Sequence, residues 1–128
     1  MKAAYKIFFL IYGGVHIIAG IVIALWPGVL NIVLSNDINY GASALVGIFA
    51  AMAGLGFYGA AFENDLRSKI VFVRLAIGAN ILNGLGHAVN ASRGESPLYM
   101  GYVGAFGVAV IIGILIFLHR GLTKTPAS

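Results

Sequence analysis

Four long apolar stretches take up nearly all of this 128-residue chain, and each has about 20 residues, enough for a helix to cross the hydrocarbon core of a bilayer. In that core a backbone has no water to bond, so a spanning segment must satisfy its own hydrogen bonds, as a helix does. We therefore predict an all-α polytopic membrane protein, a four-transmembrane-helix bundle that forms a single domain over residues 1–128. The helices are expected at residues 7–26, 41–62, 70–90 and 98–118.

Composition indicates that lipid is the main solvent of this chain. Hydrophobic residues make up 60% of it and charged residues only 9%, whereas about a quarter of the residues of a soluble domain are charged. One soluble domain of this size could not cover its surface with so few charges. The apolar stretches leave no room for a large soluble domain beside them. We expect an integral membrane protein with only short segments in water.

The formal net charge of +4 could indicate a polyanionic partner, but the positions of the basic residues explain it without one. Most basic residues lie at helix ends that would share one side of the membrane: Lys2, Lys6, Arg67, Lys69, Arg74, Arg120 and Lys124. Only Arg93 belongs to the other side. Cytoplasmic loops of membrane proteins carry such an excess of basic residues. We therefore expect the N- and C-termini in the cytoplasm and no nucleic-acid partner.

The segment VLNIVLSNDINY, between the first two predicted helices, is too short to span the membrane. It is apolar at its start and polar at its end, which is typical of a segment lying on the membrane surface. The chain begins with Met-Lys and a long apolar run, without a convincing small-residue cleavage site. We therefore expect a retained first helix and not a signal peptide.

The predicted third helix carries a polar stripe on an otherwise apolar surface. Its members are Asn80, Asn83, His87 and Asn90, which fall within about 80° of arc at about 100° of rotation per residue. A polar group that faces lipid has no partner, so the stripe should face protein, a bound molecule or a water-filled cavity. Two interpretations stay open: hydrogen bonding between helices, or the lining of a binding site for a quinone, a lipid or a small polar solute.

Tyr12 and His16, one turn apart on the first predicted helix, complete the set of candidate binding residues. His16 and His87 also raise the question of a haem. Counted from the cytoplasmic ends of their helices, these two residues differ in depth by about 12 Å at 1.5 Å per residue. Two imidazoles cannot comfortably bridge that distance around one iron. A haem shared within one subunit is therefore not expected; no cofactor is predicted, and a quinone, a lipid, or a haem held by one histidine or between subunits stays open.

No residue of the chain is predicted to be catalytic. The chain has no cysteine, which excludes disulfides, thiolate chemistry and cysteine-ligated metal. Its three histidines lie at three levels and its four carboxylates lie outside the predicted membrane core, so no metal site is expected. An activated nucleophile, a P-loop and a dinucleotide fingerprint are all missing. These features favour a protein that is not an enzyme.

Small residues recur along the predicted second and fourth helices. At spacings of three or four residues they let two helix backbones approach closely, which drives helix association in lipid. The residues expected at such contacts are Gly47, Ala51, Gly54, Gly56, Gly101, Gly104 and Gly107.

Arg74 lies one turn inside the predicted third helix. An arginine at that depth can extend its side chain to the cytoplasmic headgroups. Pairing with Glu63 or Asp65 across the preceding turn is the alternative.

Three segments suggest a family: GGVHIIAGIVIALWPG, the glycine-rich second helix that leads into ENDLRSK, and RLAIGANILNGLGHAVNASRG. With them the chain resembles the DoxX-like group of small bacterial four-helix membrane proteins. The resemblance implies the bacterial inner membrane. Some members of that group are similar to subunits of membrane oxidoreductases that deliver electrons to quinone. A thiol-based form of that redox role does not carry over to a chain without cysteine.

The first functional hypothesis is a non-catalytic accessory or structural subunit of a larger, bioenergetic membrane complex. It follows from the short extramembrane parts, the small residues suited to helix packing and the lack of catalytic groups. Its partners would be membrane lipids and other membrane subunits, or further copies of the chain. The alternatives are a stand-alone binder or transporter of a small molecule at the polar stripe, and a redox subunit associated with quinone or haem.

Overall fold

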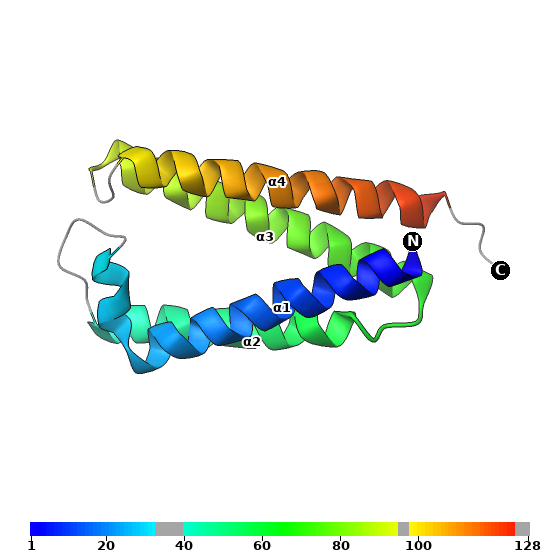
Figure 1. Ribbon diagram of the computed structural model, residues 1–128, viewed down its shortest axis with the longest axis horizontal. Helices are drawn as coiled ribbons and strands as arrows, with labels where there is room; N and C mark the ends of the chain where they lie inside the picture. The colour runs from blue at the N-terminus through cyan, green and yellow to red at the C-terminus, as the bar shows by residue number, and fades with distance from the viewer. Residues whose placement is uncertain (33–39, 95–97, 125–128) are drawn as a thin grey trace. The chain divides into compact units, whose positions relative to one another are not determined.

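The computed structural model describes residues 1–32, 40–94 and 98–124. The described residues form helices and no strand, which confirms the all-helical prediction for this part of the chain. In order, the elements are α1 (Lys2–Leu25), the short 3-10 helix η1 (Pro27–Ile32), α2 (Tyr40–Ala60), α3 (Leu66–Ser92) and α4 (Leu98–Thr123) (Figure 1). Of the predicted surface segment, residues 29–32 belong to η1 and Tyr40 begins α2, while residues 33–39 lie outside the described part.

Each of the four α-helices contains a stretch long and apolar enough to cross a membrane. This confirms the predicted number of candidate spans. The helices run further than most of the apolar stretches do, since α1 begins at Lys2 and α4 continues to Thr123. Hydropathy marks the residues that suit lipid, whereas backbone hydrogen bonding continues beyond them. Only α2 is shorter than expected, because the chain turns at Ala61 and Phe62.

Asp65 explains why α3 begins ahead of its apolar stretch. Its carboxylate accepts hydrogen bonds from the backbone N–H of Ser68 at 2.7 Å and from the Ser68 hydroxyl at 2.9 Å. A carboxylate at this position satisfies one of the unpaired N–H groups of the first turn. The same hydrogen bonds from Ser68, helped by the nearby charge of Arg67, hold the pKa of Asp65 below its ordinary value. A polar turn therefore determines where α3 starts.

Gly94 ends α3 in a conformation that favours glycine. Its φ is +70°, in the left-handed region where a Cβ is strained. The N–H of Arg93 donates to the Val89 carbonyl at 3.1 Å and the N–H of Gly94 donates to the Ala91 carbonyl at 3.2 Å. These bonds satisfy carbonyls of the last turn, as is usual where a helix ends at a residue in the left-handed conformation.

The chain divides into two compact units, Lys2–Phe62 and Glu63–Ser128. Each unit is a pair of antiparallel helices, α1 with α2 in the first and α3 with α4 in the second (Figure 1). We call them the first and the second hairpin. The single-domain bundle remains a prediction.

Glycines bring α1 and α2 into backbone contact. A Cβ placed on Gly20 would lie 2.6 Å from the Gly47 carbonyl oxygen, and one placed on Gly47 would lie 2.7 Å from the Gly20 carbonyl oxygen. Two helical turns away, Gly13 and Gly54 face each other in the same way. A Cβ placed on Gly13 would lie 2.8 Å from the Gly54 carbonyl oxygen, and one placed on Gly54 would lie 2.9 Å from the Gly13 carbonyl oxygen. The two glycines of each helix are seven residues apart, the repeat that keeps one face of a helix against an antiparallel or parallel neighbour.

The contact between α3 and α4 is made by side chains lying against glycines. The His87 ring lies on Gly104, where an added Cβ would be 2.8 Å from the ring carbon Cγ. Further along, Val108 of α4 lies against Gly84 of α3. Toward the end of α4 three leucines are buried: Leu115, Leu118 and Leu122. This hairpin is held by interlocking side chains and not by touching backbones.

Candidate functional site

Asn80 is the buried member of the polar stripe, with 3% of its surface exposed. Its side-chain Nδ2 donates to the Ala76 carbonyl at 2.8 Å, one turn earlier on α3. The Ala76 carbonyl, which already accepts from a backbone N–H of the helix, thus accepts a second hydrogen bond from the side chain. Asn80 is thus accommodated partly by its own backbone.

His87 lies in the seam between α3 and α4. Its ring is half-buried and rests on Gly104. Within the described residues, neither ring nitrogen of His87 has a hydrogen-bond partner. The contact that holds His87 is therefore a packing contact, made available because Gly104 has no side chain.

Asn83 and Asn90 lie beside the α3–α4 seam. At about 100° per residue, Asn83 is about 60° around α3 from Asn80. Asn83 is exposed and Asn90 is half-buried, and neither side chain makes a hydrogen bond in the part of the chain that the structure describes. The stripe is thus divided into a pair at the seam and a pair next to it. Both interpretations of the stripe, interhelical bonding and a binding lining, remain predictions.

His16 and Tyr12 belong to an aromatic cluster in the first hairpin. The Nδ1 of His16 lies 2.8 Å from the Tyr12 carbonyl oxygen, and since a carbonyl only accepts, Nδ1–H must be the donor. The centroids of the Tyr12 and His16 rings are 4.3 Å apart. The Phe57 ring of α2 lies edge-on to both, with its centroid 5.0 Å from that of Tyr12 and 6.2 Å from that of His16. In the neutral ring a proton on Nδ1 leaves the lone pair on Nε2, which can then accept a hydrogen bond or ligate a metal.

Phe57 was not among the predicted site residues. It lies one turn after Gly54 on α2, which brings it level with Tyr12 and His16 on α1. The regular spacing of Tyr5, Phe8, Phe9, Tyr12 and His16 on α1 was a signal for an aromatic face. No signal within α2 alone could have identified Phe57, because its position depends on how the two helices align.

Arg74 forms the only hydrogen bond between side chains of α3 and α4 within the described residues. Its Nε donates to Nε2 of His119 at 3.2 Å. The alternative of pairing with Glu63 or Asp65 is wrong for the described part of the chain, since both carboxylates accept from local groups instead. Glu63 accepts from two backbone N–H groups, at 2.7 and 2.8 Å. His119 escaped prediction because it lies 45 residues away in sequence.

The glycines expected at helix contacts occupy different surroundings. Gly47 and Gly54 lie against α1, with Ala51 opposite Gly20, while Gly101 and Gly104 lie against side chains of α3. A Cβ on Gly56 or on Gly107 would meet no atom within 4 Å. Assignment of these last two to helix packing therefore remains a prediction.

Gly13 and Gly20 of α1 were not predicted as contact residues, although both lie in the tightest contacts of the first hairpin. Their seven-residue separation matches that of Gly47 and Gly54. This matching repeat was present in the sequence and could have identified the pair.

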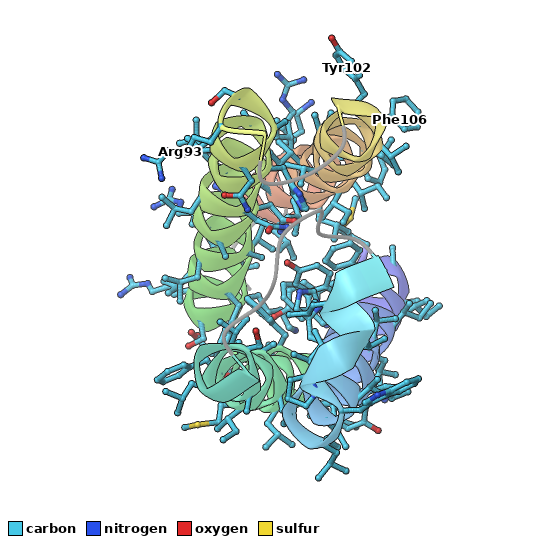
Figure 2. All side chains as sticks on the ribbon, turned by 90° about the vertical axis from the view of Figure 1, so that its left-hand side faces the viewer. Arg93, Tyr102 and Phe106 are labelled. Atoms are coloured by element: carbon cyan, nitrogen blue, oxygen red, sulfur yellow. The ribbon has the colours of Figure 1, made fainter. Side chains whose placement is uncertain are left out.

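The outer faces of the helices are apolar. Tyr102 and Phe106, with 74% and 73% of their surfaces exposed, point away from the α3–α4 pair (Figure 2). Arg93 extends from the end of α3.

Among the described residues, no three histidine or carboxylate side chains are grouped so that they could hold a metal ion. The arrangement offers apolar surface, the amides of Asn83 and Asn90 beside the α3–α4 seam, and the hydrogen-bonded imidazoles of His16 and His119.

Comparisons of the chain with protein-family models, with curated proteins and with solved structures found no match. The resemblance to the DoxX-like group therefore remains a prediction.

Proposed function

We propose that the protein is a non-catalytic accessory subunit of a larger membrane assembly, with its four long helices across the bilayer. The length and apolar character of these helices support the insertion. The large exposed side chains along them suit lipid or another membrane helix and would be costly in water.

One observation carries the proposal: the amide of Asn83 is exposed on an apolar helix and makes no hydrogen bond within the described residues. Inside a bilayer such an amide is costly without a partner. Membrane helices commonly meet this need by hydrogen bonding to a neighbouring helix. We infer that Asn83, with Asn90 two turns later, contacts a polar or small residue of a partner subunit.

Mild solubilisation and native gel electrophoresis test the proposal. The wild-type chain should migrate with partner subunits. Asn83→Leu should shift it to a smaller species while leaving its thermal stability in detergent unchanged. Leu85→Ala is the matched control, because Leu85 is 57% exposed and lies about 160° around α3 from Asn83. Migration of the wild-type chain alone, or equal effects of both substitutions, would contradict the proposed role.

The orientation follows from the positive-inside rule, which supports both termini in the cytoplasm. Because the chain has no cysteine, single cysteines can report it. Ser68→Cys should be shielded from an impermeant thiol label added outside, and Ser92→Cys should react. The reverse pattern would overturn the orientation, and labelling of both would contradict four crossings. The resemblance to the DoxX-like group supports the bacterial inner membrane and a bioenergetic assembly.

A second candidate function is the binding of a small molecule in the first hairpin. The observation that favours it is the contact of His16 Nδ1 with the Tyr12 carbonyl oxygen at 2.8 Å, in which Nδ1–H is the donor. This leaves Nε2 as an acceptor beside the Phe57 ring. An optical spectrum of the purified protein tests for bound haem. Titration with a soluble quinone tests for binding of an aromatic ligand that carries hydroxyl or carbonyl groups. Binding at this place should be lost in His16→Leu and retained in His119→Leu, which changes a histidine of the second hairpin.

A further inference from the structure

We propose that Arg74, positioned by His119, binds the phosphate of an anionic lipid headgroup at the cytoplasmic end of the second hairpin. The proposal rests on the membrane insertion proposed above but is independent of any partner subunit. It concerns a different face of α3 from the polar stripe, because Arg74 and Asn83 are nine residues apart and thus about 180° around the helix from each other.

The bond between the two helices leaves the phosphate-binding groups of Arg74 available. Only Nε donates to His119, and within the described residues the two terminal nitrogens of this exposed guanidinium have no partner. Those two nitrogens form a planar fork that matches two phosphate oxygens. Tethering of Nε also limits the rotamers of a long side chain, so less entropy is lost when the fork engages a ligand.

Other basic groups lie at the same end of the hairpin, at the start of α3 and near the end of α4. Arg67 precedes Arg74 by seven residues, which places it within about 20° of the same direction on α3. Arg120 follows His119 directly, and both Arg67 and Arg120 are exposed. Each basic residue near an anionic surface adds attraction of about 1 kcal/mol, or about fivefold in affinity.

The nearby carboxylates do not neutralise this cluster. Glu63 accepts from the backbone N–H groups of Asn64 and Asp65, and Asp65 accepts from Ser68. Within the described residues neither carboxylate pairs with Arg74. An anion from outside the chain is therefore the group that can satisfy the guanidinium.

The depth of Arg74 suits a lipid phosphate. At 1.5 Å per residue the 27 residues of α3 span about 40 Å, roughly 10 Å more than a hydrocarbon core of about 30 Å. If the helix extends about 5 Å beyond the hydrocarbon at each end, the first 5 Å of α3 lie outside it. The Cα of Arg74 is about 12 Å from the start of α3 and therefore lies about 7 Å inside the hydrocarbon. An arginine at that depth extends to the headgroups. There the first anion that the fork meets is a lipid phosphate.

The test is a lipid titration of the purified full-length protein in detergent, read by native mass spectrometry. Phosphatidylglycerol should bind at least several-fold more tightly than zwitterionic phosphatidylcholine. Arg74→Gln should weaken phosphatidylglycerol binding about tenfold, the effect of losing one bidentate charge-assisted contact. Arg93→Gln is the matched control: it removes the same charge from the other end of α3 and should leave the binding unchanged.

His119 is a positioning residue, so its test needs a conservative rescue. His119→Leu removes the acceptor and should weaken phosphatidylglycerol binding about threefold, less than loss of the arginine itself. His119→Gln restores an oxygen acceptor and should restore most of the affinity. Arg74→Lys retains the charge without the fork, and its binding should lie between those of wild type and Arg74→Gln. If Arg74→Gln does not fold, as judged by circular dichroism, the Arg74→Lys variant decides.

Several results would overturn the proposal. Equal losses in Arg74→Gln and Arg93→Gln would show unspecific charge attraction. Arg74-dependent binding of inorganic phosphate, without binding of phosphatidylglycerol, would assign the site to a free anion. Unchanged binding in His119→Leu would remove the positioning role. None of these results affects migration with partner subunits, so failure here and failure of the accessory-subunit proposal can be told apart.

Discussion

The two hairpins solve the same packing problem in different ways. In the first, α1 and α2 meet backbone to backbone at Gly13, Gly20, Gly47 and Gly54. In the second, side chains of one helix lie against glycines of the other, and a hydrogen bond joins Arg74 to His119. At these four glycines most of the nearest atoms across the first contact are backbone atoms, which cannot move aside, whereas at Gly84, Gly101 and Gly104 the nearest atoms across the second contact are side-chain atoms, which can.

This difference predicts how well each seam tolerates substitution. Backbone contact leaves no freedom, so the first seam should be intolerant of any added atom. The second hairpin carries Asn80, His87 and His119, and its seam, made at glycines by side chains, should tolerate change more easily.

Gly54→Leu should be the most damaging single substitution. A Cβ there would lie 2.6 Å from the backbone nitrogen of Ile17 and 2.9 Å from the Gly13 carbonyl oxygen, so the helices must separate. We expect a loss of about 3 kcal/mol in the free energy of unfolding. Gly56→Leu, on the same helix, meets no atom within 4 Å and should be neutral. Thermal unfolding in detergent measures both, and equal tolerance would refute backbone contact in the first hairpin.

Gly104→Ala should have a smaller effect, and a reversible one. The new methyl would press on the His87 ring, 2.8 Å from Cγ, and a side chain can shift where a backbone cannot. We expect a loss of about 1 kcal/mol. In a His87→Ala background the same substitution should cost little, so a double-mutant cycle should show coupling between the two positions. Full additivity would show that His87 does not lie on Gly104.

The Arg74–His119 hydrogen bond should contribute less still. Hydrogen bonds between membrane helices average about 0.6 kcal/mol, and we expect a coupling energy of that size from the cycle of Arg74→Leu and His119→Leu. The measurement is again thermal stability in detergent. A coupling above about 2 kcal/mol would mean that this bond holds the hairpin together and does not merely orient the guanidinium.

Lowering the pH should have the smallest effect on stability, confined to the first turn of α3. Because the pKa of Asp65 is held below its ordinary value by Ser68, the ionised cap stabilises the start of α3 fully above about pH 4. That stabilisation is lost as the pH falls through the lowered pKa. Amide hydrogen exchange at residues 66–69 should therefore become faster relative to the middle of α3. Asp65→Asn keeps an acceptor that does not titrate, so its cap should show no such change.

The number and approximate places of the long helices were determined by the sequence alone. Hydropathy and chain length are local properties, and a backbone in lipid has few alternatives to a helix. The ends needed more information: Asp65 extended α3 backward through a side-chain cap, which a hydropathy pattern does not register. Charge patterning likewise predicted an orientation without reference to any tertiary contact.

Tertiary structure decided which of several similar residues meet. Gly54 and Gly56 are both glycines of α2 in an apolar sequence, yet only Gly54 touches α1. Phe57 lies beside His16, and His119 accepts from Arg74, although neither pairing is visible in a single helix. The physical reason is register. The periodicity of one helix tells which residues share a face, but the alignment of two helices along their axes depends on the sum of all contacts in the seam, and that sum exists only in the folded hairpin.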